Sequence, residues 1–296
     1  MKTSHFLFVV LAGICWGTGG VLGVLLSEHS DLHPLSVAMW RMLIAGVALL
    51  LLLALTGQLR LRSYTRQAWM RALLTGGLTA IFEAMYFTGI SMSSVGLATL
   101  VAIGSAPVFV ALYDWLFRRE RPAARTLIAL ALALAGLVTL LSGSLETGSN
   151  GLLGALLAMT CGFAFAIITV INRTPVPGFE PVPLTGIAFA AGGLMLVPVA
   201  AFAGIDAPKG VGGWGFAVAV GVIATALAYV AYLTGLKTVP PFVATIVILL
   251  EPLIATVLGI VVLDEALGLG VIVGGVALAA AVVLLRPQRD EPETIH

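Results

Sequence analysis

Two glutamates stand near the middle of long apolar stretches of the sequence. Glu83 lies within residues 67–90 and Glu251 within residues 241–262. Charged groups are costly in hydrocarbon, so ionisable side chains at such places mark a functional site by default. Because burial favours the neutral form of a carboxyl group, either glutamate could exchange a proton, or stay ionised and hold a cation. Glu251 directly precedes Pro252, so a role in the fold is an equal alternative.

Two further charged residues lie inside apolar stretches. Arg41 is expected about two turns into its helix; an ion pair with a carboxylate is its favoured role, and contact with a substrate carboxylate is the alternative. Asp114 is near a helix end and four residues before Arg118, so it can pair with that arginine or reach water. Arg41, Glu83 and Glu251 are therefore the candidates for ion coupling or for an internal ion pair.

Aromatic residues recur at helical spacing beside the carboxylates. Tyr86 follows Glu83 by three residues, and Tyr229 and Tyr232 have the same spacing, so each pair shares one face of a helix. Aromatic faces together with a carboxylate suit an ammonium group through cation–π contact. These residues, with Trp16 closing the space between them, are the predicted substrate-binding wall; a place in the aromatic belt of the membrane surface is the alternative.

Two prolines lie inside predicted helices, at Pro107 and Pro252. Each removes the N–H that would normally bond the carbonyl four residues earlier, that of Ile103 or Ile248. Such openings are tolerated in a membrane where they face protein or a wet cavity. Both prolines are predicted hinges, and a packing kink without ligand contact is the alternative.

The composition of the chain points to the bilayer as its solvent. Of 296 residues, 60% are apolar and 10% are charged, and the mean hydropathy is +1.10, whereas soluble domains carry about 25% charged residues. An all-α membrane protein is therefore expected, whose first apolar stretch is a retained helix rather than a signal peptide. Ten stretches are long and apolar enough to span a membrane: residues 5–26, 34–56, 67–90, 95–117, 122–142, 150–171, 181–204, 212–234, 241–262 and 267–285.

Positive charge in short loops marks the cytoplasmic side of a membrane protein. With a cytoplasmic N-terminus, thirteen of the fifteen Lys and Arg residues fall on that side; Lys209 is external and Arg41 lies within a helix. An even number of spans returns the C-terminus to the same side. Both termini are therefore predicted to be cytoplasmic.

The second half of the sequence repeats the first at an offset of about 146 residues. Residues 86–90 recur as residues 232–236, and the two helix-interior prolines correspond as well. Residues 1–146 are predicted to form one five-helix repeat, and residues 147–296 a second one that ends in a short polar tail. Because five is an odd number, the second repeat enters the membrane upside down, as in carriers that bind substrate between their halves.

Several classes of protein are not supported by the sequence. The net charge of +1 is spread over loops and offers no basic stripe for nucleic acid. Cys15 and Cys161 lie inside apolar runs, and the histidines lie at membrane edges or in the tail, so no metal site is expected. The chain offers no nucleophile and base for an enzyme, no phosphate loop for ATP, and no reason to expect a cofactor. A channel is less favoured, because no filter-like repeat or ring of charge is visible.

Short motifs occur in order along the chain: Trp16-Gly17, Arg41 with Ala45-Gly46, Pro107 with Glu120-Arg121-Pro122, and Glu251-Pro252 with Asp264-Glu265. In this order, and with the duplication, the chain resembles the drug/metabolite transporter superfamily, of the EamA type, over nearly its whole length. The resemblance implies a ten-helix carrier of the cell membrane that uses no ATP. It also implies that the third, fourth, eighth and ninth helices form a scaffold around which the first, second, sixth and seventh move.

The same resemblance implies a function. A secondary-active transporter that exports amino acids or related small amino-bearing metabolites by alternating access is expected. Uptake of cationic or quaternary amines, or transport of nucleosides or sugars by the same fold, are the alternatives. The expected partners are a small-molecule substrate, the lipid bilayer, protons as a coupling ion, and a second copy of the chain in a homodimer to which the last helix could contribute.

Overall fold

The computed structural model describes residues 1–144, 150–263 and 267–287. Within these ranges the chain forms helices joined by short turns, with a single isolated bridge between Val176 and Phe179. The predicted all-α class is thus confirmed for the described part of the chain. The polar tail after Pro287, and the motif residues Asp264 and Glu265, lie outside the described residues.

Nine described helical stretches are long and apolar enough to cross a membrane. A further apolar helix, α12 (Leu269–Leu285), has 17 residues; it coincides with the tenth predicted helix, and its crossing of the membrane stays a prediction. The nine stretches are Thr3–His29 (α1), Pro34–Leu55 (α2), Arg66–Met92 (α3), Val95–Arg118 (α4, Val95–Tyr113, and a π-helical turn), Ala124–Leu141 (α5), Gly151–Asn172 (α6), Pro181–Ala203 (α7), Gly210–Gly235 (α8, Gly210–Gly221, and α9, Ala228–Gly235) and Pro241–Leu263 (α10, Pro241–Val247, and α11, Glu251–Leu263).

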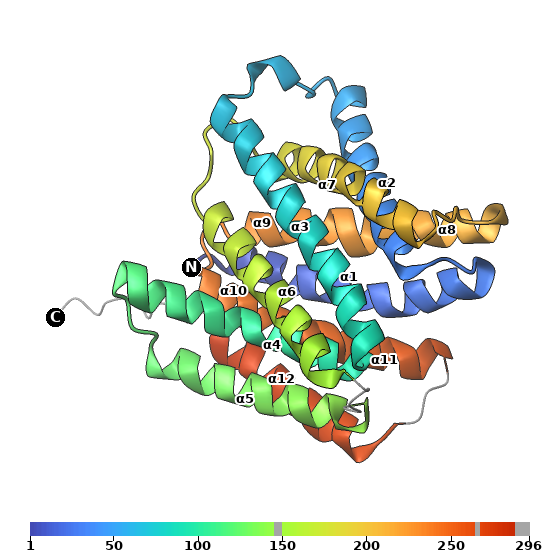
Figure 1. Cartoon of the computed structure of the whole chain (residues 1–296). Coiled ribbons are helices and arrows are strands. Elements are labelled where there is room, and N and C mark those ends of the chain that lie inside the picture. Colours follow the sequence, from blue (N-terminus) through green and yellow to red (C-terminus); the bar gives the residue numbers. More distant parts are fainter. Residues whose placement is uncertain (145–149, 264–266, 288–296) are drawn as a thin grey trace.

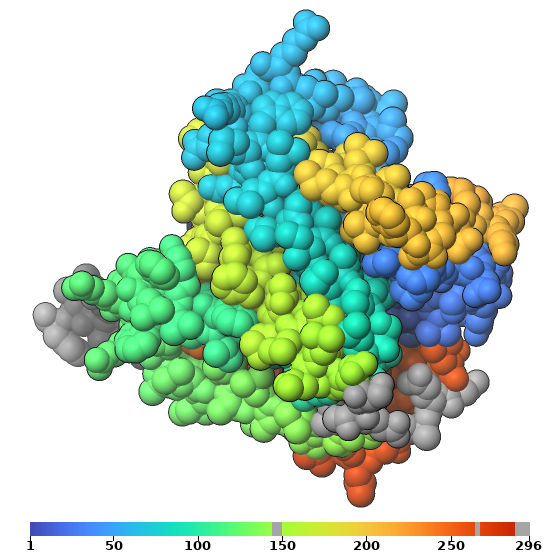
Figure 2. Space-filling model, viewed as in Figure 1, coloured from blue at the N-terminus to red at the C-terminus, as the bar shows by residue number. Residues whose placement is uncertain are grey.

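The helices pack in pairs that correspond between the two halves of the chain (Figure 1). α2 lies against α7 and α5 against α12. α6 packs on α3 and α4, while α1 packs on α8, α9 and α11. On the face shown in Figure 2, α3 and α6 lie side by side and cover the middle of the molecule. A duplicated five-helix unit predicts this exchange of partners; the inversion and the boundary between residues 146 and 147 stay predictions.

The span that contains α8 and α9 changes its hydrogen-bond pattern halfway along. Val222–Leu227 form a π-helical turn, in which the Thr225 hydroxyl donates to the Val220 carbonyl five residues back, over 3.0 Å. A π-helical turn inserts an extra residue and redirects the side chains that follow it, and such turns are frequent at functional sites. The turn packs against α1 and α2.

The span that contains α10 and α11 is also interrupted, by a 3₁₀ turn at Ile248–Leu250. Pro252 has no N–H to donate to the Ile248 carbonyl. The tighter turn lets the Glu251 N–H donate to that carbonyl instead. The carbonyl that the sequence predicts to be without its usual donor is therefore satisfied, and the cost of the proline is a local change of helix type beside Glu251.

Basic ends of the spans gather on one side of the molecule. The Lys2 N–H donates to the Thr238 hydroxyl over 3.1 Å, and the adjacent Lys237 pairs with Glu180 before α7. The guanidinium of Arg71, in α3, donates to two carbonyls at the end of α6. Segments predicted to be cytoplasmic thus contact one another, and their exposure to the cytoplasm stays a prediction.

Candidate functional site

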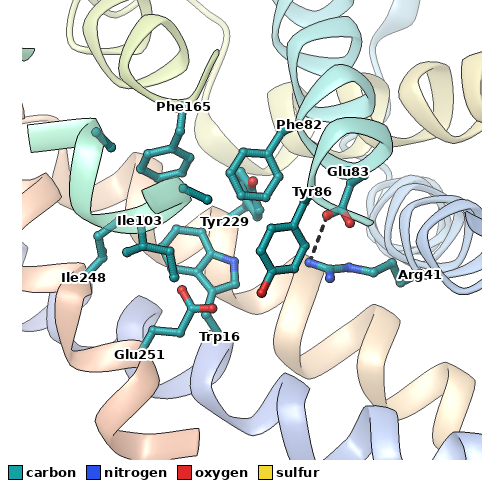
Figure 3. Close-up of a pocket in the computed structure, with 12 residues that line it drawn as sticks. Trp16, Arg41, Phe82, Glu83, Tyr86, Ile103, Phe165, Tyr229, Ile248 and Glu251 are labelled. Carbon is teal, nitrogen blue, oxygen red and sulfur yellow. Dashed lines mark ion pairs between the residues drawn. The ribbon is translucent and has the colours of Figure 1, made fainter. Parts of the chain in front are cut away.

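A cavity of about 80 Å³ lies in the middle of the molecule, between helices of both halves (Figure 3). A volume of this size admits a few water-sized groups. The cavity is reached by side chains from α1, α2, α3, α4, α6, α9, α11 and the 3₁₀ turn before α11. Its lining holds six residues of the predicted site, Trp16, Arg41, Glu83, Tyr86, Tyr229 and Glu251, and also Phe82, Ala102, Ile103, Ala106, Phe165 and Ile248.

Glu83 and Arg41 form an ion pair at one side of the cavity. Nη2 of Arg41 lies 3.2 Å from Oε1 of Glu83, and their side chains are 22% and 3% exposed. Nε of Arg41 also donates to the Thr225 hydroxyl over 3.2 Å, from the π-helical turn. A buried charge needs a partner to offset its loss of hydration, so the charge of each residue is balanced within the protein.

Glu251 lies on the other side of the cavity and has no such partner. Among the described residues, none makes a hydrogen bond or an ion pair with its carboxylate. Figure 3 shows this carboxylate beside the Trp16 ring, away from the Arg41 guanidinium. With two glutamates and one arginine ionised, the lining has a net charge of −1. The cavity therefore offers one carboxylate without a counter-charge.

The rest of the wall is mainly aromatic. The Trp16 ring meets that of Tyr229 edge-on with centroids 5.0 Å apart, and that of Phe165 at 5.9 Å. Phe82 and Tyr86 are stacked 5.9 Å apart, one turn from each other along α3. Aromatic faces attract cations through the ring quadrupole. The wall thus combines a negative charge with several surfaces that stabilise a positive one.

Tyr232, which the sequence places in the same wall, lies behind it. Its side chain is fully buried, and its hydroxyl is 2.8 Å from the hydroxyl of Thr169. Its ring packs 5.3 Å from the rings of Trp16 and Phe165, and it is absent from the cavity lining. In this conformation Tyr232 supports the wall instead of forming its surface.

The two predicted hinge prolines adjoin the cavity through their neighbours. Pro107 follows Ala106 inside α4, and Pro252 follows Glu251 at the start of α11. Both prolines are buried, and both preceding residues line the cavity. A change of bend at either proline would therefore alter the wall itself. Whether these prolines act as hinges stays a prediction.

Two rings of the wall, Phe82 and Phe165, are not among the residues predicted from sequence. Phe82 lies four residues before Tyr86 and hence on the same face of α3, so its spacing was a usable signal. Phe165 has no comparable signal, because nothing close to it in sequence indicates which face of α6 turns toward the cavity.

Fold and site together define the class of protein. The chain is an integral membrane protein whose helices surround a small cavity that is partly charged and partly aromatic, at the place between the two halves where membrane carriers bind their solutes. Over the described ranges, no group of three or more His, Cys, Asp or Glu side chains is placed to hold a metal ion. Cys15 and Cys161 are both free and buried.

Comparison with known proteins identifies the family. The chain matches the EamA-like transporter family over residues 3–142 and 152–286, and it belongs to that family. The expected kinship with the EamA type is thus confirmed, and the protein is a multi-pass membrane transporter.

The relatives are named as transporters. The uncharacterized transporter YwfM of Bacillus subtilis is 31% identical over 266 residues, which cover 89% of this chain and 87% of the relative. The uncharacterized inner membrane transporter YicL of Salmonella typhimurium is 27% identical, over 94% of this chain and 93% of its own. An uncharacterized transporter of Archaeoglobus fulgidus is 25% identical over 98% of this chain and all of its own length. A crystal structure of a protein with 20% sequence identity shares the fold, with a TM-score of 0.77 over 96% of each chain.

Proposed function

We propose that this protein is a secondary-active carrier that exports amino acids or related small amino-bearing metabolites by alternating access. The observation that carries the proposal is the Glu251 carboxylate, which faces an aromatic cavity without an ion pair among the described residues. The direction of transport follows from the resemblance to exporters of the same superfamily. The name of the relative YicL supports the inner, or cell, membrane as the location.

The chemistry of the cavity favours a positively charged amino group. Because Arg41 is paired with Glu83, Glu251 is the carboxylate that remains open to a solute. An ammonium group beside it would also meet the ring faces of Trp16 and Tyr86. Each such cation–π contact is worth about 0.5–2 kcal/mol when water is excluded.

Glu251 is also the proposed coupling residue. A carboxylate in a membrane cavity can hold a proton or a cation, one at a time. If Glu251 gives up its proton to the cytoplasm when it takes up an ammonium group, and is protonated again from outside when the solute leaves, each exported solute is exchanged for one entering proton. The same residue would then select the solute and couple its export to the proton gradient.

Uptake of cationic or quaternary amines is the second candidate, and a specific observation favours it. Arg41 is already engaged with both Glu83 and Thr225, so the cavity lining offers a solute carboxylate no free cation. Nucleosides and sugars are less suited, because they bring no positive charge to Glu251.

The test is transport by the purified full chain in liposomes. Vesicles are loaded with individual amino acids, with the amines that their decarboxylation gives, or with neutral nucleosides and sugars. We expect efflux of one or more amino acids that is faster when the outside is acidic. Glu251→Gln is expected to lower the rate at least about tenfold and to remove its dependence on the pH gradient. Glu28→Gln, which alters an exposed carboxylate outside the cavity, is the matched control and should transport as the wild type does.

The other outcomes separate the candidates. Transport of amines without amino acids would select the second candidate. Transport of neutral solutes alone, undiminished in Glu251→Gln, would contradict both and leave only the family's carrier architecture.

A further inference from the structure

A second cavity, here named the Asn172 pocket, opens at the end of the molecule where the basic segments gather. It has a volume of about 230 Å³ and lies between α3, α6, α7 and α9. Its polar lining consists of Arg71, Asn172, Thr174, Glu180 and Lys237.

Asn172 is the polar group in the floor of this pocket. It is 8% exposed, and its Nδ2 donates to the Ile168 carbonyl over 2.9 Å and to the Thr75 hydroxyl over 3.1 Å. Since a carbonyl can only accept, the nitrogen must be the atom on that side. Oδ1 is therefore the atom left without a hydrogen-bond partner. A buried acceptor in that state is costly unless a donor reaches it, so the pocket is suited to a ligand that brings an N–H or O–H group.

The rim of the pocket has the opposite charge to the central cavity. Arg71 and Lys237 contribute two positive charges and Glu180 one negative charge, so the rim has a net charge of +1. One nitrogen of the Arg71 guanidinium donates to carbonyls at the end of α6, and Lys237 pairs with Glu180. The remaining nitrogens of Arg71 make no hydrogen bond among the described residues, and they can receive a carboxylate.

A line of polar side chains joins the pocket to the central cavity along α3. Arg71, Thr75, Thr79 and Glu83 follow one another at intervals of four residues, so they share one face of the helix. Thr75 and Thr79 are each 1% exposed. The hydroxyls of Tyr232 and Thr169, which are 2.8 Å apart, are buried as well. One polar face of α3 therefore extends from the Asn172 pocket, where Asn172 donates to Thr75, to Glu83 in the central cavity.

We propose that the Asn172 pocket is a second binding site for the transported solute, and that this solute is a zwitterionic amino acid. Its carboxylate would bind Arg71, and its ammonium group would donate to Oδ1 of Asn172. The proposal rests on the proposed function, and it narrows the substrate class. The central cavity attracts a cation, and the Asn172 pocket attracts an anion that also carries a hydrogen-bond donor. A zwitterionic amino acid meets both conditions, whereas a simple amine is repelled by the positive rim of the Asn172 pocket.

Occupancy of the Asn172 pocket can be measured by the rate at which an introduced cysteine is labelled. Thr174 is exposed and lines the pocket, so Thr174→Cys supplies a thiol whose reaction with a neutral thiol reagent can be timed. The wild type gives the background rate, because Cys15 and Cys161 are both buried. Each proteinogenic amino acid except cysteine, whose thiol would consume the reagent, is added in turn to the purified full chain, as are the amine lacking its carboxylate and acetate. The same measurement is made with Glu251→Gln present, which removes the proposed central contact.

We expect at least one amino acid to slow labelling of Thr174→Cys about threefold or more, with or without Glu251→Gln, while its amine and acetate do not. Asn172→Leu should abolish this protection. Lys237→Gln, at the exposed rim, should raise the half-protecting concentration about tenfold even if Asn172→Leu fails to fold. Arg66→Gln removes a positive charge from the same end of the molecule but not from the pocket, and it should leave protection unchanged.

Equal protection by an amino acid and by its amine, or none by any amino acid, would overturn the inference. Failure of this inference is distinguishable from failure of the proposed function. Liposome export of amino acids without protection of Thr174→Cys would leave the proposed function in place and remove the second site. Protection without any export would retain the pocket as a binding site and refute the proposed carrier activity.

Discussion

At the scale of single residues, the two carboxylates of the central cavity differ in what they contact. Glu83 is almost fully buried and paired with Arg41, whereas Glu251 has no partner among the described residues. Breaking a buried ion pair leaves the remaining charge uncompensated, at a cost of about 3–5 kcal/mol. Removing a charge that has no partner leaves nothing unpaired.

Neutralising Glu83 is therefore predicted to lower the stability of the protein. Neutralising Glu251 is predicted to remove transport without lowering stability. Glu83→Gln should lower the thermal unfolding temperature of the purified protein markedly, because Arg41 is left unpaired. Glu251→Gln should leave that temperature unchanged or higher while transport is lost. The double variant Arg41→Gln/Glu83→Gln is the control, and it should recover part of the stability. Equal losses of stability in the two single variants would contradict this assignment.

The aromatic wall makes a second prediction at the same scale. Tyr86 lines the cavity, and its hydroxyl is 2.7 Å from the hydroxyl of Thr99. Tyr86→Ala should weaken binding of an amino-bearing solute about tenfold, whereas Tyr86→Phe should be milder because it keeps the ring face. Equal effects in equilibrium binding would show that the hydroxyl makes the contact.

Tyr232→Ala is the comparison for that series. It removes a ring that is fully buried behind Trp16 and Phe165, so its main effect should be a loss of stability, of about 3–5 kcal/mol for a buried aromatic side chain. A loss of affinity without any loss of stability would place Tyr232 in the binding surface, in an alternate conformation.

At the scale of the helix, two faces of α3 have different contacts. One carries the polar residues Arg71, Thr75, Thr79 and Glu83, and the other packs against α7. At Gly76 a Cβ atom would lie 2.1 Å from the Ala188 carbonyl oxygen of α7, while at Gly77 the nearest atom would be 3.7 Å away, in the flexible Met195 side chain. Small residues at such contacts allow helix backbones in a membrane to approach closely.

This difference predicts the outcome of a matched pair of substitutions. Gly76→Ala should force α3 and α7 apart and destabilise the protein by about 1–3 kcal/mol, as overpacking does. Gly77→Ala should be neutral or stabilising, because alanine favours a helix more than glycine does. Thermal unfolding of the purified variants tests this, and similar values for the two would mean that α7 adapts to the added methyl group.

The glycines of the last helix, α12, also lie at a close contact between two helices. A Cβ atom at Gly274 would lie 2.6 Å from the Gly136 carbonyl oxygen of α5. The glycine face of α12 is therefore occupied within the chain. A homodimer, which stays a prediction, would have to use another face of this helix.

At the scale of the whole molecule, the loops form two groups, one at each end, and the loops of each group contact one another. At one end Trp40 donates to the Asp206 carbonyl over 2.9 Å, and the Lys209 N–H donates to the Ser30 hydroxyl over 2.8 Å. At the other end the segments around Lys2, Arg71 and Lys237 meet. The first group contains the single loop lysine that the charge pattern assigns to the outside.

Reporter fusions can test this orientation. Fusions after Arg60 and Arg119 are predicted to be cytoplasmic, as is one at Arg289, outside the described residues. Fusions near His29 and Lys209, and near Glu146 outside the described residues, are predicted to be external. Activity of paired cytoplasmic and periplasmic reporters is the measurement, and a single reversal would contradict the inverted repeat.

Much of this protein was determined by its sequence alone. Hydropathy is a local property averaged over about twenty residues, so the helical class and the nine described spans follow from it within a few residues. The cost of burying a charge in hydrocarbon pointed to Glu83, Glu251 and Arg41. Helical spacing placed Tyr86 on the same face of its helix as Glu83. Each of these inferences depends only on residues close together in the chain.

Only the tertiary structure decided which of these residues act together. Arg41 pairs with Glu83 and not with Glu251 because α2 and the π-helical turn at Thr225 hold its guanidinium on that side. Phe165 enters the wall and Tyr232 leaves it because the rotation of each helix about its axis is set by its neighbours, α3 and α4 for α6 and α1 for α9. Helix rotation and changes of helix type depend on contacts between distant segments, and no local pattern in the sequence encodes them.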